Sequence, residues 1–204
     1  MPNWCDCDLE IYGPKDDVEA VLALVNQPDP SREGDRPEHG CWFSFEAVVP
    51  MPREEHETAA RIVREQMAAA GVEEGTQEGR QWLIDNYGSK WRGPIDAKSP
   101  INGFNWLGYD WAIENWGTKW GAVDPLLYVS VVAADDDCEQ AAYRFATAWS
   151  PPTPIVAALA KRFPNVRFTL DGYERGAAYH SSDVFMDGEC VSSVTERYDG
   201  ERGG

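Results

Sequence analysis

The chain has 204 residues, enough for one large domain or two small ones. Hydrophobic residues make up 43% and aromatic residues 12%, with 9 tryptophans, and this composition excludes a disordered chain. The formal net charge of -17 argues against direct binding to nucleic-acid phosphates or anionic membranes, because such binding needs an excess of Lys and Arg.

The acidic composition leaves two explanations open. The first is solubility, or adaptation to a salty cytoplasm, and charge by itself favours this explanation. The second is a surface that presents carboxylates to a basic partner, for example as a mimic of DNA. The candidate acidic surface consists of Asp135, Asp136, Asp137 and Glu139. Their spacing does not match a calcium-binding loop, so we expect a solvated turn there and no metal.

The cysteines and the start of the chain indicate the cellular compartment. The number of cysteines, 5, is odd, and the sequence shows neither a signal peptide nor an apolar run long enough to span a membrane. We therefore predict a cytosolic protein with reduced thiols. Cys5 and Cys7 could share a metal with Cys41 and His39, but the paired spacing typical of zinc sites is absent. We expect core cysteines, and neither a metal nor another cofactor.

The first half of the chain predicts strands and helices in alternation. Residues 4–12 alternate between a side with Asp6 and Asp8 and a side with Leu9 and Ile11, which predicts a half-buried strand. A helix is expected at about 14–26 and a second strand at 41–49. Two more helices are expected at about 53–70 and 79–87, after proline and glycine breakers.

The most distinctive segment is 105–120. Its large apolar residues recur at spacings of three and four, the period of one helix face. They are Trp106, Tyr109, Ile113, Trp116 and Trp120. We expect an aromatic helix, ended by Gly117, whose stripe packs on a large surface such as the face of a sheet.

The second half predicts a hairpin, a helix and three more strands. The hairpin strands are expected at 126–134 and 142–149, and Ser150 is expected to cap a helix that runs to about 163. Strands follow at 166–173, 176–186 and 189–197, with a tight turn at Asp187-Gly188. Residues 199–204 are polar and rich in Gly, which predicts a flexible tail.

This order of elements predicts an α+β fold with a ferredoxin-like βαββαβ antiparallel sheet and helices on one face. The segment 41–49 is taken as the second strand of that pattern. A helical Trp-rich insertion then occupies about 53–124, and the last strands extend the sheet. We expect a single domain over 1–198.

Five segments carry a resemblance to a known family. They are MPNWCDCDLEIYGP, FEAVVPMP, WAIENWGTKWGA, FATAWSPPTP and FPNVRFTLDGYERG, and they follow one another from Pro2 to about Gly176. Together they resemble the Api92-like family, which includes plasmid YubB-type proteins with a ferredoxin-like domain. The resemblance implies a phage, prophage or plasmid origin, a place in the cytoplasm of the bacterial host and a ferredoxin-like fold. It implies no activity and no catalytic residue.

One cluster of residues is a candidate binding site. Trp116 and Trp120 flank Lys119 at the expected helix end, so an exposed indole could stack on a ligand while the ammonium meets an anion. Trp149 and Glu174 could complete the site. The alternative is a buried Trp plug, with Trp149 as its partner, and the helical spacing favours this alternative.

Three functions stay open from the sequence. The first is a non-enzymatic accessory protein of a phage or mobile element, which binds a host or defence protein with a basic surface and inhibits it. The second is a small-molecule or nucleotide-binding protein, or an enzyme, with the Trp116 and Lys119 site. The third is a structural or virion component. The sequence leaves the oligomeric state undecided.

Overall fold

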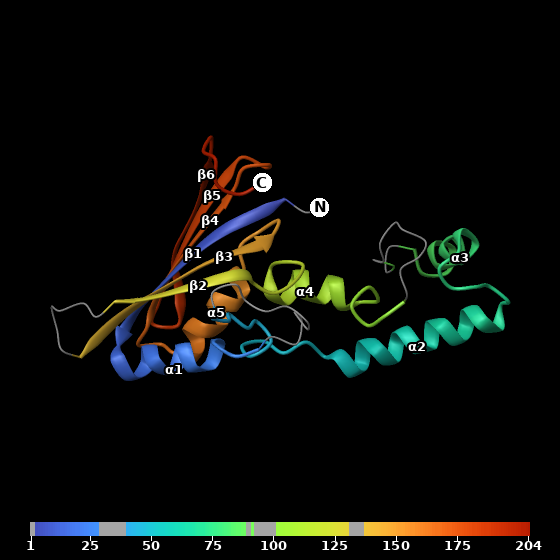
Figure 1. Cartoon of the computed structure of the whole chain (residues 1–204), viewed down its shortest axis with the longest axis horizontal. Coiled ribbons are helices and arrows are strands. Elements are labelled where there is room, and N and C mark those ends of the chain that lie inside the picture. The colour runs from blue at the N-terminus through green and yellow to red at the C-terminus, as the bar shows by residue number, and fades with distance from the viewer. Residues whose placement is uncertain (1–2, 29–39, 89–90, 92–100, 131–136) are drawn as a thin grey trace. The chain divides into compact units, whose positions relative to one another are not determined.

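Figure 1 shows the computed structural model of the chain, which describes residues 3–28, 40–88, 91, 101–130 and 137–204. They form two compact units, one of Met1–Pro50 with Glu114–Gly204 and the other of Met51–Ile113. The single domain with an insertion at about 53–124 stays a prediction. Within the described ranges, no helix is both long and apolar enough to cross a membrane.

The first unit contains β1 (Trp4–Pro14), α1 (Lys15–Val25), β2 (Val123–Ser130), β3 (Cys138–Ala148), α5 (Thr153–Arg162), β4 (Arg167–Glu174), β5 (Tyr179–Met186) and β6 (Glu189–Arg197). The second unit contains α2 (Arg53–Ala69) and α3 (Gln77–Tyr87). Helix α4 (Gly108–Trp116) carries the chain across the boundary between the units.

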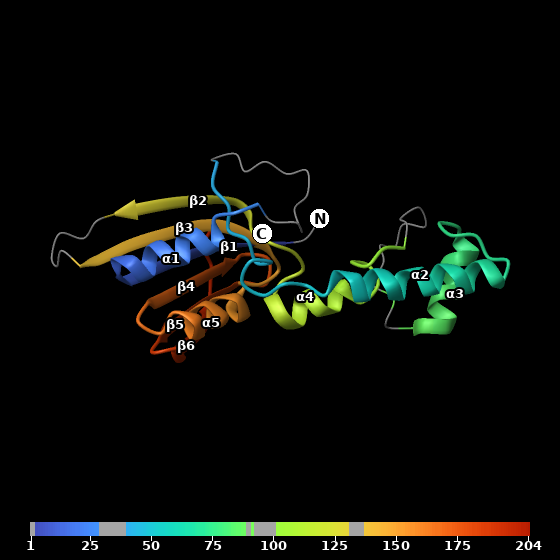
Figure 2. The same ribbon diagram turned by 90° about the horizontal axis from the view of Figure 1, so that it is seen from below.

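The described strands form one antiparallel sheet in the order β2-β3-β1-β4-β5-β6. The elements β1, α1, β2, β3, α5 and β4 form a βαββαβ pattern interrupted by α2, α3 and α4, and their four strands occupy adjacent places in the sheet. The ferredoxin-like prediction is therefore confirmed, with β5 and β6 as the predicted extra strands. Figures 1 and 2 show α1 and α5 on the same face of the sheet.

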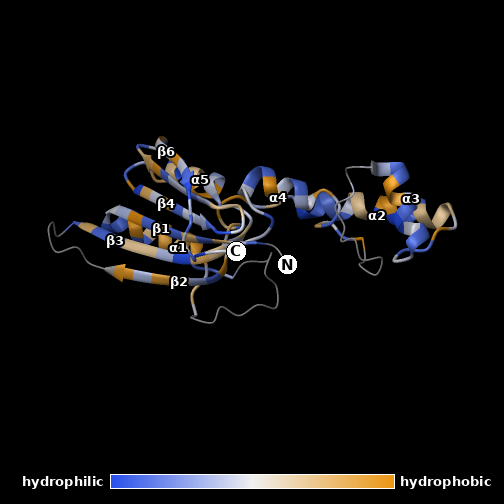
Figure 3. Cartoon of the chain, turned by 90° about the horizontal axis from the view of Figure 1, so that it is seen from above, coloured by the Kyte–Doolittle hydropathy of each residue, from blue (hydrophilic) through white to orange (hydrophobic). Residues whose placement is uncertain are grey.

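The alternation predicted for the first strand is confirmed in the core. Cys5, Cys7, Leu9 and Ile11 of β1 are fully buried, and the residues between them are more exposed. The same face is covered by buried aliphatic residues of α1 and α5, namely Val18, Val21, Val25, Ile155, Val156 and Leu159. Hydrophilic and hydrophobic segments accordingly follow one another along the strands in Figure 3. Among the described residues of this unit, no helix covers the other face of the sheet.

The prediction of a strand at 41–49 is wrong. This segment is irregular, and Val49 closes a turn by donating its N–H to the carbonyl of Phe45. Its aromatic residues pack as side chains, since Phe43 stacks on Phe145 of β3 with ring centroids 5.0 Å apart. The second strand of the βαββαβ pattern is instead β2, far later in the chain. Residues 131–134 of the predicted hairpin lie outside the described part.

The prediction of a single aromatic stripe over 105–120 is also wrong. Helix α4 is shorter than predicted, and residues with positive φ lie on either side of it, Leu107 at 71° and Gly117 at 78°. Trp106 joins the core of the 51–113 unit, whereas Trp116 is fully buried in the other unit. Ile113 between them is 40% exposed. The large apolar residues at helical spacing therefore contribute to two separate cores.

Candidate functional site

The open face of the sheet, which lies opposite α1 and α5, gathers charged and aromatic side chains. On β1 it carries Asp6 and Asp8, between the buried cysteines and Leu9. Residues directly opposite in an antiparallel pair share a face, so the register decides their neighbours. Asp8 lies opposite Arg144 of β3 and Asp171 of β4, and Asp6 lies opposite Tyr173. The remaining members, on β5 and β6, are His180 and Glu196.

Arg202 occupies the centre of this face. Its Nη1 donates to Asp8 Oδ2 at 2.7 Å and its Nη2 donates to Asp8 Oδ1 at 3.0 Å. The Nε lies 3.9 Å from Asp6 Oδ2, and the guanidinium carbon lies 4.0 Å from the ring centroid of Tyr173. The guanidinium therefore meets a two-pronged carboxylate contact and an aromatic face at once.

Tyr173 is held in place by its neighbours on the sheet. Its ring stacks on the imidazole of His180, with centroids 4.5 Å apart and planes 14° apart. The imidazole in turn contacts Asp171 through Nε2 at 3.1 Å and Glu196 through Nδ1 at 3.2 Å. The Tyr198 ring packs edge-on against the Tyr173 ring, with centroids 5.4 Å apart. The stack on His180 therefore holds the Tyr173 ring without any contact from Arg202.

Residues 198–204, called here the 198–204 segment, bring Arg202 to the site. The Arg202 N–H donates to the Tyr198 hydroxyl at 3.1 Å, and the Gly203 N–H donates to Asp6 Oδ2 at 3.2 Å. The Gly204 N–H donates to the carbonyl of Trp4 at 2.7 Å. Backbone and side-chain contacts therefore dock residues 199–204 on β1, and the flexibility of this tail stays a prediction.

The charges of the site stabilise one another. Burial by itself raises the pKa of Asp8, but hydrogen bonds from Arg202 and Arg144 outweigh it and hold the pKa below its ordinary value. The hydrogen bond to Asp8 raises the pKa of Arg202 above its ordinary value. Burial, followed by the charge of Asp171, raises the pKa of Tyr173, so its hydroxyl stays protonated at neutral pH.

The five predicted binding residues lie in different environments. Trp116 is fully buried and donates its Nε1–H to the carbonyl of Val49 at 2.8 Å. Lys119 places its Nζ 4.2 Å from the ring centroid of Trp120, and burial lowers its pKa. The Trp120 ring also lies 6.4 Å from that of Trp4.

The other two predicted binding residues, Trp149 and Glu174, lie at the same end of the sheet but differ in exposure. Trp149 is 49% exposed, although its backbone is fixed by bonds to Asn3 and Tyr179. Glu174 is 1% exposed and accepts the N–H groups of Gly176 and Ala177, which closes the turn between β4 and β5. Its role is that of a turn cap.

The predicted acidic surface is only partly described. Asp135 and Asp136 lie outside the described residues, and Asp137 is exposed, with its carbonyl accepting the N–H of Lys15. Glu139 is 8% exposed, so its assignment to a solvent-facing surface is wrong. It falls on the inward side of β3 because alternation along that strand buries every second residue. In the described ranges, no group of three or more potential ligands could hold a metal ion.

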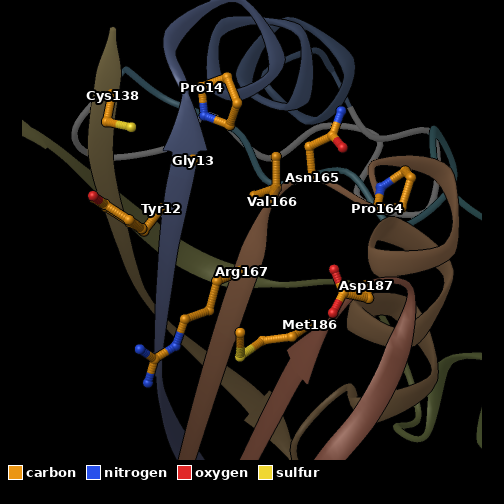
Figure 4. Close-up of a pocket in the computed structure, with 10 residues that line it drawn as sticks. All are labelled: Tyr12, Gly13, Pro14, Cys138, Pro164, Asn165, Val166, Arg167, Met186 and Asp187. Atoms are coloured by element: carbon orange, nitrogen blue, oxygen red, sulfur yellow. The ribbon is translucent and has the colours of Figure 1, made fainter. Parts of the chain in front are cut away.

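A cavity of about 330 Å³ lies at the end of β1 opposite to Trp4 (Figure 4). It is lined by the end of β1, the start of β3 and β4, and the turn before β6, and its lining residues include Tyr12, Arg167 and Met186. None of the residues predicted for a small-molecule site lines it. The predicted site and this cavity are therefore separate features.

The sequence analysis missed the most highly organised site. Asp8 was assigned to the polar side of its strand, but Tyr173 and Arg202 were not singled out. Alternation along 166–173 could have shown that Tyr173 faces the same way as Asp171. No local signal could have paired Arg202 with Asp8, which are 194 positions apart.

Comparisons with known proteins bear on the fold. Residues 129–202 match a family model described as the ferredoxin-like domain in Api92-like protein. The crystal structure of Api92 from Yersinia pseudotuberculosis is similar over 98% of this chain and 99% of that chain, with 14% sequence identity and a TM-score of 0.47. A search of curated proteins found no match. The family match confirms the Api92-like resemblance and assigns no activity.

Proposed function

From the premise that this chain carries the ferredoxin-like domain of the Api92-like family, we propose that it is a non-enzymatic accessory protein that binds a basic partner. The partner is a host or defence protein with an arginine-rich surface, and the open face of the sheet is the binding surface. The observation that carries the proposal is the two-pronged contact between Asp8 and a guanidinium stacked on Tyr173.

The charge of the chain supports this function. A net charge of -17 attracts basic proteins over distances of about 10 Å at ordinary ionic strength and accelerates their encounter. The open face then presents its negative charges in a fixed arrangement. Asp6, Asp8, Asp171 and Glu196 lie around the stacked rings of Tyr173 and His180. A DNA-binding protein is the natural class of partner, because its own basic surface evolved to meet an array of negative charges. Such binding would inhibit it in the manner of a DNA mimic.

The test compares two variants with the same change in net charge. In the first, Glu10→Lys and Glu196→Lys reverse two charges on the open face, where both side chains are exposed. In the control, Asp16→Lys and Glu19→Lys reverse two exposed charges on α1, on the opposite side of the sheet.

We expect wild-type protein and the α1 control to recover the same basic protein from bacterial lysate at low salt. The open-face variant should recover much less of it, and binding of the purified partner should weaken steeply as salt is added. An excess of DNA should compete. Recovery of no basic protein by the wild type, or equal recovery by both variants, would overturn the proposal.

A further inference from the structure

The site around Asp8 is more selective than an acidic surface needs to be. Two parallel hydrogen bonds to one carboxylate require the planar fork of a guanidinium, which an ammonium group does not have. The carbon of the same guanidinium lies over the Tyr173 ring, 4.0 Å from its centroid, and a position over an aromatic ring again favours Arg over Lys. The geometry is therefore that of a receptor for an arginine side chain.

Asp8 and Tyr173 form the walls of this receptor, and contacts other than those with Arg202 hold them in place. Asp8 accepts a third hydrogen bond, from Arg144 Nε on β3 at 3.0 Å, and this bond does not involve Arg202. Tyr173 keeps its stack on His180, whose ring is held between Asp171 and Glu196. A site whose walls are fixed by the sheet stays formed when it is empty.

The occupant, in contrast, is carried by a short segment that is not part of the sheet. The residues after Tyr198 form neither helix nor strand, and they bond to β1 through the Arg202 side chain and the N–H groups of Gly203 and Gly204. Arg202 is still 33% exposed in its side chain, and Asp8 is 28% exposed. Contacts of this kind on a short segment open readily, without unfolding of the sheet.

We propose that the Asp8 and Tyr173 site receives an arginine side chain of the partner, and that the 198–204 segment is an intramolecular competitor that must leave first. This inference rests on the proposed function, and it names the chemical group that the open face recognises. A tethered competitor acts at an effective concentration of about millimolar, so it excludes weak arginine ligands and admits a partner that binds through several contacts. The segment thereby raises specificity for a large basic surface.

The test uses the 204-residue chain, labelled with ¹⁵N, and two peptides. One peptide has the sequence of residues 199–204, Asp-Gly-Glu-Arg-Gly-Gly, and the other has Lys in place of its Arg. Binding is followed by chemical-shift changes at the amides of Asp8 and Tyr173. We expect Arg202→Ala to bind the Arg peptide at least about tenfold more tightly than the wild type, since the competitor is removed. The Lys peptide, or the added change Asp8→Asn, should lower the affinity about tenfold or more.

Equal affinity of the Arg peptide for the wild type and for Arg202→Ala would overturn the inference, as would equal affinity of the Arg and Lys peptides for the variant. A measurement on the wild type covers the case in which Arg202→Ala does not fold. Saturating Arg peptide should then displace the segment and accelerate hydrogen exchange at the Gly203 and Gly204 amides. Unchanged exchange under saturation would refute the competition.

The two proposals fail in different ways. If the wild type recovers its basic partner but the vacated site binds no Arg peptide, only the present inference falls. If the Arg peptide binds Arg202→Ala but no basic partner is recovered, the function proposed above falls, and with it the role of this site in recognising a partner.

Discussion

Arg202 and Asp8 lie 194 positions apart and form two parallel hydrogen bonds of 2.7 and 3.0 Å on the open face of the sheet. The contact joins the 198–204 segment to the central part of β1. Because Arg144 also bonds to Asp8, the carboxylate lies between two guanidinium groups from different elements.

Arg202→Ala should lower the free energy of unfolding by about 1 kcal/mol, because a partly exposed two-pronged ion pair and a cation–π contact are both lost. Arg202→Lys should recover less than half of the difference, since an ammonium cannot form the fork. Urea unfolding followed by tryptophan fluorescence measures both values. The matched control is Arg197→Ala, which removes an exposed ion pair to Asp199 and should change stability by less than about 0.5 kcal/mol.

The contribution of Asp8 should depend on pH in a defined direction. Its pKa is lower in the folded chain than its ordinary value of 3.8, so the folded state favours the charged form. The stabilisation is therefore present above that ordinary value and is lost as the pH falls through the folded pKa. The stability gap between wild type and Asp8→Asn should be full near neutral pH and shrink as the pH drops below about 4. A gap that is constant over this range would contradict the assignment.

Gly203→Ala should release the 198–204 segment. Gly203 has a φ of 76°, and an added Cβ would lie 2.7 Å from the carbonyl oxygen of Trp4. Gly40→Ala is the matched control, because its φ is 71° but nothing lies within 4 Å of the added atom. Both changes carry a backbone strain of about 1 kcal/mol. Only Gly203→Ala should also accelerate hydrogen exchange at Gly204, and equal exchange in the two variants would argue against close docking.

Trp116 and Trp149 should differ sharply in their contribution to stability. Trp116 is fully buried and its indole N–H is bonded to Val49, so Trp116→Ala should cost about 3–5 kcal/mol. Trp149 is 49% exposed, and Trp149→Ala should cost less than about 1 kcal/mol. Chemical unfolding of the two variants measures the difference. A small loss for Trp116→Ala would reopen the prediction that this residue belongs to a binding site.

The cysteines should react in the order of their exposure. Cys190 is exposed, whereas Cys5 and Cys7 are fully buried, and burial raises the pKa of Cys7 well above its ordinary value. Alkylation of the folded chain followed by mass spectrometry should therefore label Cys190 first. Cys5 and Cys7 should be labelled only in denaturant. Rapid labelling of the β1 pair without denaturant would mean that the core opens at that strand.

Two errors of the sequence analysis have one physical cause. Alternating or helical spacing shows that a face is buried, but not what buries it. The segment 41–49 buries Phe43 and Phe45 against β3 without pairing as a strand, and the residues of 105–120 bury Trp106 and Trp116 in different units. In both cases the apolar side chains are buried, but against other parts of the chain than the spacing predicted.

The sequence by itself determined the ferredoxin-like class, most of the helices and strands, and the assignment of Asp6 and Asp8 to the polar side of the first strand. These features depend on periods of 2 and 3.6 residues and on turn residues, which act over a few positions. Only the tertiary structure decided that β2 completes the βαββαβ pattern and that Arg202 meets Asp8 over Tyr173. These contacts depend on the register of the strands and on segments that are far apart in the sequence. No local sequence pattern encodes them.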